Sequence, residues 1–221
     1  DPHLNDYTPP PDNGLTLLHQ DTALLVVDKP SGLLSVPGRG ENKQDSLLSR
    51  VRQRWPEAEC VHRLDMETSG VMVLARGKSV QRDLNRQFQR RHVGKQYVAL
   101  VNGHVDSSAG EIELPLICDW PNRPRQKVDF SLGKPSHTRF TVTGYDAGND
   151  STRLSLFPKT GRSHQLRVHL QALGHCILGD SLYASPKARR KATRLMLHAT
   201  GIRFSHPLSG EPVHYTADEP F

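Results

Sequence analysis

The 221-residue sequence predicts an α+β protein built on a large mixed, mainly antiparallel sheet that is flanked by helices and loops. Segments in which apolar and polar residues alternate outnumber the segments with helical spacing. The two kinds of segment do not alternate regularly along the chain, as they would in a parallel sheet built from βαβ units. A hydrophobic fraction of 35% and a charged fraction of 24% indicate a globular protein with a large polar surface.

Residues 1–14 contain three consecutive prolines and few apolar residues, which predicts an irregular N-terminal arm. We expect residues 15–221 to form a single domain. Within it, the predicted strands share short length and many β-branched or alternating apolar residues. They cover residues 15–19, 24–27, 71–74, 97–101, 111–116, 137–145, 153–157, 195–204 and 212–215.

Three helices are expected between these strands. The first covers residues 45–55, with Asp45 as its N-cap and Pro56 ending it. The second covers 79–91, and the third covers 163–173, with Gly174 as its C-terminal stop. In the third helix the residues expected to point inward are Leu166, Leu170 and Leu173.

The helix over 79–91 carries two different faces. Apolar residues recur every four positions on one face, which predicts packing on the core. Arginines recur at the same spacing on another face, which predicts three cations in a row. The apolar set is Val80, Leu84 and Phe88, and the basic set is Arg82, Arg86 and Arg90.

The net charge of +6 favours a polyanionic partner, and the cations are grouped rather than dispersed. A solvated surface is the simpler interpretation of any one group. The groups lie at residues 50–54, 82–91 and 187–194, and a fourth set lies in a Pro- and Arg-rich loop predicted over 118–134. In that loop Arg123, Arg125 and Lys127 are candidates for contact with the polyanion, although packing against a neighbouring strand is an alternative.

Three widely spaced cysteines favour neither a disulfide framework nor a cysteine zinc site, and they favour a reducing cytoplasm. His164 and His169 lie five residues apart, on different helix faces, so we expect no metal site. No apolar run approaches the ~20 residues of a membrane span, and no signal-peptide pattern is present.

The most informative segment runs from residue 61 to residue 75. It begins with a polar cluster, His-Arg-Leu-Asp, and continues through Thr-Ser-Gly into a predicted buried strand. Gly70 allows a tight turn just before that strand. Arg63 and Asp65 are therefore carried on a segment fixed by the core, which suits one nucleophilic or basic carboxylate. A surface ion pair between the two residues is the alternative.

This segment resembles the catalytic motif of the RluA-type pseudouridine synthases. Three further segments resemble other motifs of the family and follow in the same order, over about residues 24–180. They are residues 26–33, around Lys-Pro-x-Gly, residues 95–97, Lys-Gln-Tyr, and residues 159–169. Residues 116–124 resemble the bacterial member that acts on both ribosomal and transfer RNA.

The resemblance implies the pseudouridine synthase catalytic fold with a central cleft, and no separate N-terminal S4-like RNA-binding domain. It implies that Asp65 is catalytic and is compensated by the charge of Arg167. The other implied site residues have supporting roles, each with a structural alternative such as a core aromatic or a surface cation. Tyr97 would stack on the target uracil, Leu166 would line its pocket, Arg63 would fill the space the flipped base leaves, and Lys29 would support the site.

The implied reaction isomerises uridine to pseudouridine in structured RNA and needs no cofactor, since no atom is added and no redox change occurs. Asp65 could attack the ribose, attack the base or take the C2′ proton. We expect a cytoplasmic monomer that acts on stem-loops of large-subunit ribosomal RNA and of transfer RNA. The alternatives are a non-catalytic RNA-binding or chaperone module and a glycosidic-bond hydrolase that would release free uracil.

Overall fold

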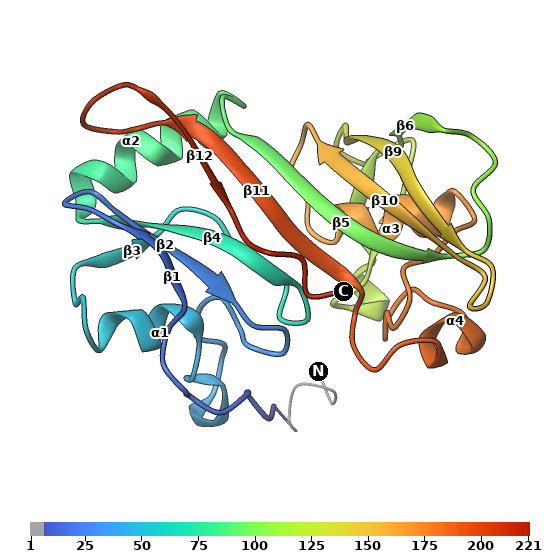
Figure 1. Cartoon of the computed structure of the whole chain (residues 1–221), viewed down its shortest axis with the longest axis horizontal. Helices are drawn as coiled ribbons and strands as arrows, with labels where there is room; N and C mark the ends of the chain where they lie inside the picture. Colours follow the sequence, from blue (N-terminus) through green and yellow to red (C-terminus); the bar gives the residue numbers. More distant parts are fainter. Residues whose placement is uncertain (1–6) are drawn as a thin grey trace. The chain divides into compact units, whose positions relative to one another are not determined.

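The computed structural model describes residues 7–221. It confirms the α+β class, because most of the regular structure is antiparallel strand and the helices are few and short (Figure 1). The chain divides into two compact units. The first unit consists of residues 7–95 and 199–220, and the second unit consists of residues 96–198 with Phe221. Within the described residues, no helix is long and apolar enough to cross a bilayer.

The strands of the first unit follow the order β1-β2-β4-β11, with β3 paired to β4 and β12 paired to β11. All of these pairs for which a register is defined are antiparallel; in β2 and β4, for example, Leu24 pairs with Ala75 and Lys29 with Gly70. The strands are β1 (Leu17–Gln20), β2 (Leu24–Lys29), β3 (Ala58–Cys60), β4 (Ser69–Arg76), β11 (Leu197–Ser205) and β12 (Pro212–Thr216). Nearly every residue of β2 and β4 is buried, so both faces of these strands are covered.

Gly70 lies inside β4 rather than in a turn before it, which corrects the expectation from the sequence. Its φ is +123°, and a Cβ built on it would collide with the backbone of Ala199 in β11. The glycine is therefore needed for close approach of two strands as well as for its backbone conformation.

Two helices of the first unit pack along β3 and β4 (Figure 1). The first, α1 (Leu47–Arg52), is shorter than expected, and Ser46 caps it rather than Asp45. Ser46 and Ser49 form a reciprocal capping box. Asp45 instead accepts two hydrogen bonds from Arg50, both at 2.8 Å. Its carboxylate therefore binds a charged partner, which is a stronger interaction than capping the backbone N–H groups of the helix.

The second helix, α2 (Lys78–Gln89), agrees with the prediction. Val80 and Leu84 are buried, while the three arginines of the other face lie toward solvent. Phe88 is half-buried and stacks on the His62 ring, with ring centroids 5.2 Å apart.

The second unit contains the antiparallel order β5-β10-β9-β6 and a separate β7–β8 hairpin. Its elements are β5 (Gly94–Asn102), β6 (Ala109–Glu113), β7 (Leu116–Cys118), β8 (Gln126–Val128), β9 (His137–Asp146), β10 (Ser151–Pro158), α3 (Gln165–Ala172) and α4 (Pro186–Arg190). Helix α3 packs beside β8 and β9. The core of this unit includes Leu154, Leu156 and Leu170, all of them fully buried.

Three expectations for the second unit were wrong. The segment 118–134 is not one long loop, because β8 and a 3₁₀ turn, η3 (Trp120–Asn122), lie within it. The strand expected over 111–116 is divided between β6 and β7. Leu173 is exposed, because it is the C-cap residue at which the chain leaves the helix and the inward spacing ends.

The close approach at Gly70 leads to a stability prediction. Replacing Gly70 with Ala combines an unfavourable φ with a backbone collision, whereas Gly77 has a φ of +103° and open space where a Cβ would lie. Gly70→Ala should therefore lower the free energy of unfolding by about 1–3 kcal/mol more than Gly77→Ala does. Urea unfolding of both variants measures the difference. Equal losses of stability in the two variants would mean that β4 and β11 move apart at Gly70 without an energetic cost.

Candidate active site

The loop that carries Asp65 is held by the segment that follows β2. Lys29 is fully buried, with 0% of its surface exposed. Its Nζ donates to the carbonyl oxygens of Pro30 at 3.0 Å, Leu33 at 2.6 Å and Met66 at 2.9 Å. The N–H of Gly32 also donates to the Met66 carbonyl, at 2.8 Å. One ammonium therefore joins the turn at residues 30–33 to the residue immediately after Asp65.

Two serine hydroxyls complete this attachment. Ser31 Oγ donates to the carbonyl of Glu67 at 2.6 Å. Ser35 Oγ donates to the carbonyl of Leu64 at 2.6 Å and accepts from the Leu64 N–H at 3.0 Å. The backbone is thus held immediately before and after Asp65, and the main chain there has little freedom to move.

Asp65 is half-buried and Arg63 is exposed. The backbone carbonyl of Asp65 accepts from the N–H of Thr68 at 3.0 Å, which closes a tight turn.

His62 supports β4 through a hydrogen bond to the backbone of that strand. Its Nε2 accepts the N–H of Val73 at 2.9 Å, so a neutral ring carries its proton on Nδ1. The protein packed around the ring and, to a smaller extent, the nearby Lys95 charge lower the pKa of His62 to about 3. Burial also lowers the pKa of Lys95. His62 is therefore neutral at pH 7.

In the second unit, the Arg167 side chain is 3% exposed and makes a bidentate contact with a carboxylate that the sequence analysis missed. Its Nε donates to Asp180 Oδ2 at 2.8 Å and a terminal nitrogen donates to Oδ1 at 2.6 Å. A guanidinium has five N–H groups. Asp180 accepts a hydrogen bond from one N–H on each of these two nitrogens. The contact fixes the plane of the guanidinium and leaves three N–H groups for other acceptors.

Tyr183 connects Arg167 to the β7–β8 hairpin. Its ring lies 5.2 Å from the Arg167 guanidinium carbon. The N–H of Gln126, in β8, donates to its hydroxyl at 2.8 Å, and the hydroxyl lies 2.6 Å from His164 Nδ1. His164 precedes α3 with a φ of +55°, a conformation that is uncommon for a residue with a side chain. A single buried phenol thus fixes both the hairpin and the start of α3.

The remaining candidates of the second unit lie on its core side. Tyr97 is half-buried in β5, pairs with Leu156 across the sheet and packs against the core. Leu166 is buried in α3. Lys29, Arg63 and Asp65 thus belong to the first unit, and Tyr97, Leu166 and Arg167 belong to the second.

Asp180 could have been noticed in the sequence. It follows the apolar run Ile177-Leu178-Gly179, where a carboxylate is expected to be buried and then requires a cation. The sequence contains no comparable signal for His62, since its acceptor role depends on a strand eleven residues away.

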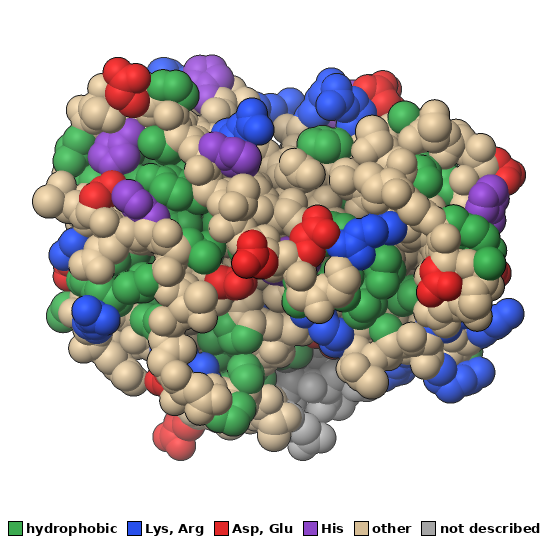
Figure 2. Space-filling view, in the orientation of Figure 1, with side chains coloured by type: hydrophobic (Ala, Val, Ile, Leu, Met, Phe, Trp, Pro, Cys, Tyr) green, Lys and Arg blue, Asp and Glu red, His purple; other side chains and the backbone are tan. Residues whose placement is uncertain are grey.

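The candidate RNA-binding cations lie at the surface. They are Arg82, Arg86 and Arg90 on and just after α2, and Arg123, Arg125 and Lys127 on the β7–β8 hairpin. Lys and Arg side chains also gather over α4, at the lower right of Figure 2.

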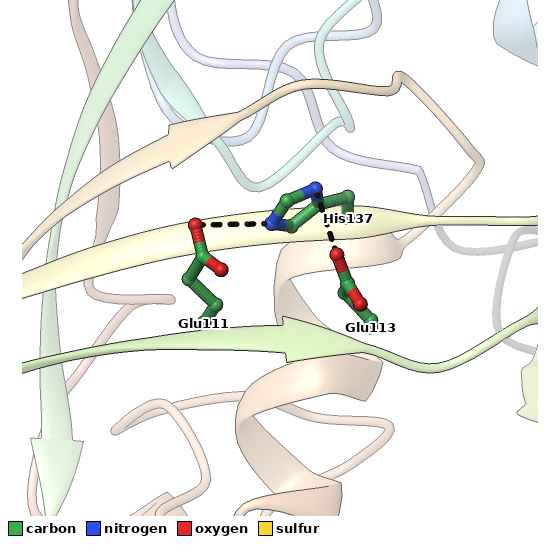
Figure 3. Close-up of side chains that lie close together, drawn as sticks. All are labelled: Glu111, Glu113 and His137. Carbon is green, nitrogen blue, oxygen red and sulfur yellow. Dashed lines mark ion pairs between the residues drawn. The ribbon is translucent and has the colours of Figure 1, made fainter.

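Among residues 7–221, one group of potential metal ligands is present, formed by Glu111, Glu113 and His137 (Figure 3). Glu111 Oε1 lies 3.4 Å from Nε2 of the histidine, and Glu113 Oε1 lies 3.3 Å from Nδ1. The carboxylates approach different nitrogens of one ring. This geometry suits a histidine bridging two carboxylates better than three ligands converging on an ion.

Comparisons with known proteins show the family of the chain. The family model described as RNA pseudouridylate synthase matches residues 23–172. The protein is 53% identical to the dual-specificity RNA pseudouridine synthase RluA of Escherichia coli strain K12, over 99% of both chains. It is 49% identical to the protein of the same name from Haemophilus influenzae, over 99% of both chains.

Solved structures show the same similarity. Human RNA pseudouridylate synthase domain containing 1 superposes with a TM-score of 0.81 at 31% identity, covering 97% of this chain and 87% of that one. Human RNA pseudouridylate synthase domain containing 4 gives a TM-score of 0.74 at 25% identity, covering 93% and 88%.

The lowered pKa of His62 predicts an acid-sensitive first unit. An unfolded histidine takes up a proton near pH 6.5, whereas folded His62 does so near pH 3. Between these values the unfolded state binds more protons, so His62 should reduce stability as the pH falls, by up to about 1.4 kcal/mol per pH unit. His62→Gln, which keeps an acceptor for Val73, should remove this part of the pH dependence.

The measurement is urea unfolding between pH 4 and pH 8 for the unsubstituted protein and the variant. His214, on β12 at the surface, provides the matched control, and His214→Gln should leave the pH dependence intact. If His62→Gln kept the original slope of unfolding free energy against pH, another group would be responsible for the loss of stability in acid.

Proposed function

Because this chain belongs to the RNA pseudouridylate synthase family and is an RNA pseudouridine synthase, we propose that Asp65 is its catalytic carboxylate and that it modifies both ribosomal and transfer RNA. The observation that carries the first part is the attachment of the Asp65 loop to Lys29, Ser31 and Ser35. The second part rests on the similarity, over 99% of the chain, to relatives named dual-specificity synthases.

The reaction breaks the bond between uracil N1 and ribose C1′, rotates the base and forms a bond from C5 to C1′. The C5 proton is lost and N1 gains a proton, so the product is an isomer. An ionised carboxylate whose main chain is already fixed can act on the nucleotide without a large reorganisation. We assign this role to Asp65 and a positioning role to buried Lys29.

Arg167 supplies positive charge for this chemistry. A guanidinium stays charged at every physiological pH, and its pairing with Asp180 orients it before RNA binds. We assign Tyr97 to stacking on the target uracil and Leu166 to lining its pocket. A uracil in a stem-loop must leave the stack to react, and exposed Arg63 is suited to occupy the space it leaves.

We further propose that residues 15–221 act as one catalytic domain in a cytoplasmic monomer. The substrates assigned to it are stem-loops of large-subunit ribosomal RNA and anticodon stem-loops of transfer RNA. The surface cations of α2 and of the β7–β8 hairpin bind the phosphates of these RNAs.

Replacing the carboxylate tests the central assignment. Asp65→Asn should lower the rate of isomerisation by at least about 100-fold, because the amide can neither attack nor accept a proton. RNA affinity should stay within about twofold, since it depends on many cations. Tritium release from C5-labelled uridine measures the rate, with a ribosomal RNA fragment and a transfer RNA anticodon stem-loop as separate substrates.

The exposed carboxylate Asp106 serves as the control, and Asp106→Asn should retain full activity. Near-normal turnover by Asp65→Asn would exclude Asp65 as the catalytic group. Activity of the unsubstituted protein on one RNA class alone would leave the family assignment intact and refute the dual substrate range.

The arginine face of α2 should determine much of the salt dependence of binding. Replacing Arg82, Arg86 and Arg90 with Gln should weaken binding and reduce the slope of log Kd against log salt by about 2 to 3. Single-turnover rates at saturating RNA should change little. On the same helix Lys78 is paired with Glu59 at 3.1 Å, so Lys78→Gln is the control and should hardly change the slope. An unchanged slope in the triple variant would mean that this face does not contact RNA.

A further inference from the structure

The segment that begins at the β7–β8 hairpin exposes several large apolar side chains. Trp120, in η3, is 69% exposed, and Phe130, just after β8, is 78% exposed. Leu132 is exposed in the same segment. Single exposed apolar residues are ordinary, but several on one segment make that segment a candidate binding surface.

One cation lies against the exposed indole, and others follow in the hairpin. The Arg123 guanidinium carbon lies 4.0 Å from the centroid of the Trp120 ring. Arg125 and Lys127 follow in the hairpin and are exposed as well. An exposed aromatic ring on a segment that carries several cations can combine base stacking with phosphate neutralisation, which is how proteins bind unpaired nucleotides.

The hairpin holds the indole on an ordered structure. Strand β7 pairs with β8 from Leu116↔Val128 to Cys118↔Gln126, and the N–H of Asp119 donates to the carbonyl of Arg125 at 2.9 Å. At the start of β8, Gln126 donates to the buried Tyr183 hydroxyl. Since these contacts already order the backbone, stacking on Trp120 costs little additional entropy.

We propose that Trp120, with Arg123 beside it, is a stacking platform for an unpaired base of the substrate RNA other than the target uracil. This inference rests on the proposed function, which assigns the target uracil to Tyr97. Through this contact Trp120 would favour RNAs that have an unpaired base at a second position of the stem-loop. Phosphate contacts from Arg125 and Lys127 place that base against the indole.

The chain offers a direct probe, because it has two tryptophans and they differ in exposure. Trp55 is 6% exposed and Trp120 is 69% exposed. Binding of an anticodon stem-loop RNA should quench the Trp120 emission and protect it from acrylamide. Trp120→Phe reports the emission of Trp55 alone, and in that variant RNA should change the emission very little.

Affinity tests the same contact without fluorescence. Trp120→Ala should weaken binding of the intact stem-loop by about 5- to 100-fold. A second RNA keeps the phosphates, the stem and the target uridine but has abasic sites at the other loop positions. Trp120→Ala should bind this RNA as the unsubstituted protein does. Leu208→Ala, at another exposed apolar residue, is the matched control and should bind both RNAs normally.

The platform is overturned if RNA leaves the tryptophan emission unchanged and if Trp120→Ala binds the intact RNA as tightly as the unsubstituted protein does. The exposed indole would then serve another partner, such as a protein. An equal loss of affinity on the intact and abasic RNAs would also overturn the platform. Tritium release by the unsubstituted protein on the intact stem-loop is measured first. Its absence would refute the proposed transfer RNA substrate, whereas its presence with either outcome above would refute the platform alone.

Discussion

The buried ammonium of Lys29 is the interaction on which the Asp65 loop depends. Removing such a charge from water costs several kcal/mol, and the cost is offset when the charge is fully hydrogen-bonded. Here the Lys29 ammonium is bonded to three backbone carbonyls, one of which belongs to Met66. The compensation requires those carbonyls to converge. The first unit can therefore bury this charge only if the turn after β2 and the Asp65 loop come together.

The second unit uses the same principle with charges of both signs. Arg167 and Asp180 are both buried, and each would be strongly unfavourable there without the other. The N–H groups of Leu182 and Tyr183 also donate to Asp180, which holds the carboxylate in place. Tyr183 then extends the arrangement to the β7–β8 hairpin through Gln126. A cation oriented before substrate arrives can stabilise developing charge without reorganising during the reaction.

The exposed groups have a different physical role. The arginines of α2 and the cations of the hairpin are in contact with water, so they lose little on folding and remain available to phosphates. Phosphate contacts supply affinity that is largely independent of sequence, whereas contacts with bases supply selectivity. In the proposed function, the buried charges thus organise the chemistry, and the exposed cations and the indole of Trp120 contact the surrounding RNA.

The sequence by itself determined the features that depend on local spacing. Alternation predicted the long strands β5, β9 and β10, and a four-residue period predicted α2 with its buried Val80 and Leu84 and its surface arginines. The motif resemblance predicted the family that the comparisons show. Such features are readable because neighbouring residues share one geometry, so burial repeats with the period of the element.

Only the tertiary structure decided which polar groups meet. Asp45 lost the predicted cap position because Arg50 pairs with it, and Gly70 proved to be required by the backbone of Ala199, far away in the chain. The partners of Lys29, His62 and Arg167 likewise come from other turns and strands. A hydrogen bond depends on position and angle in three dimensions, and spacing along the chain does not specify either once the partners belong to different elements.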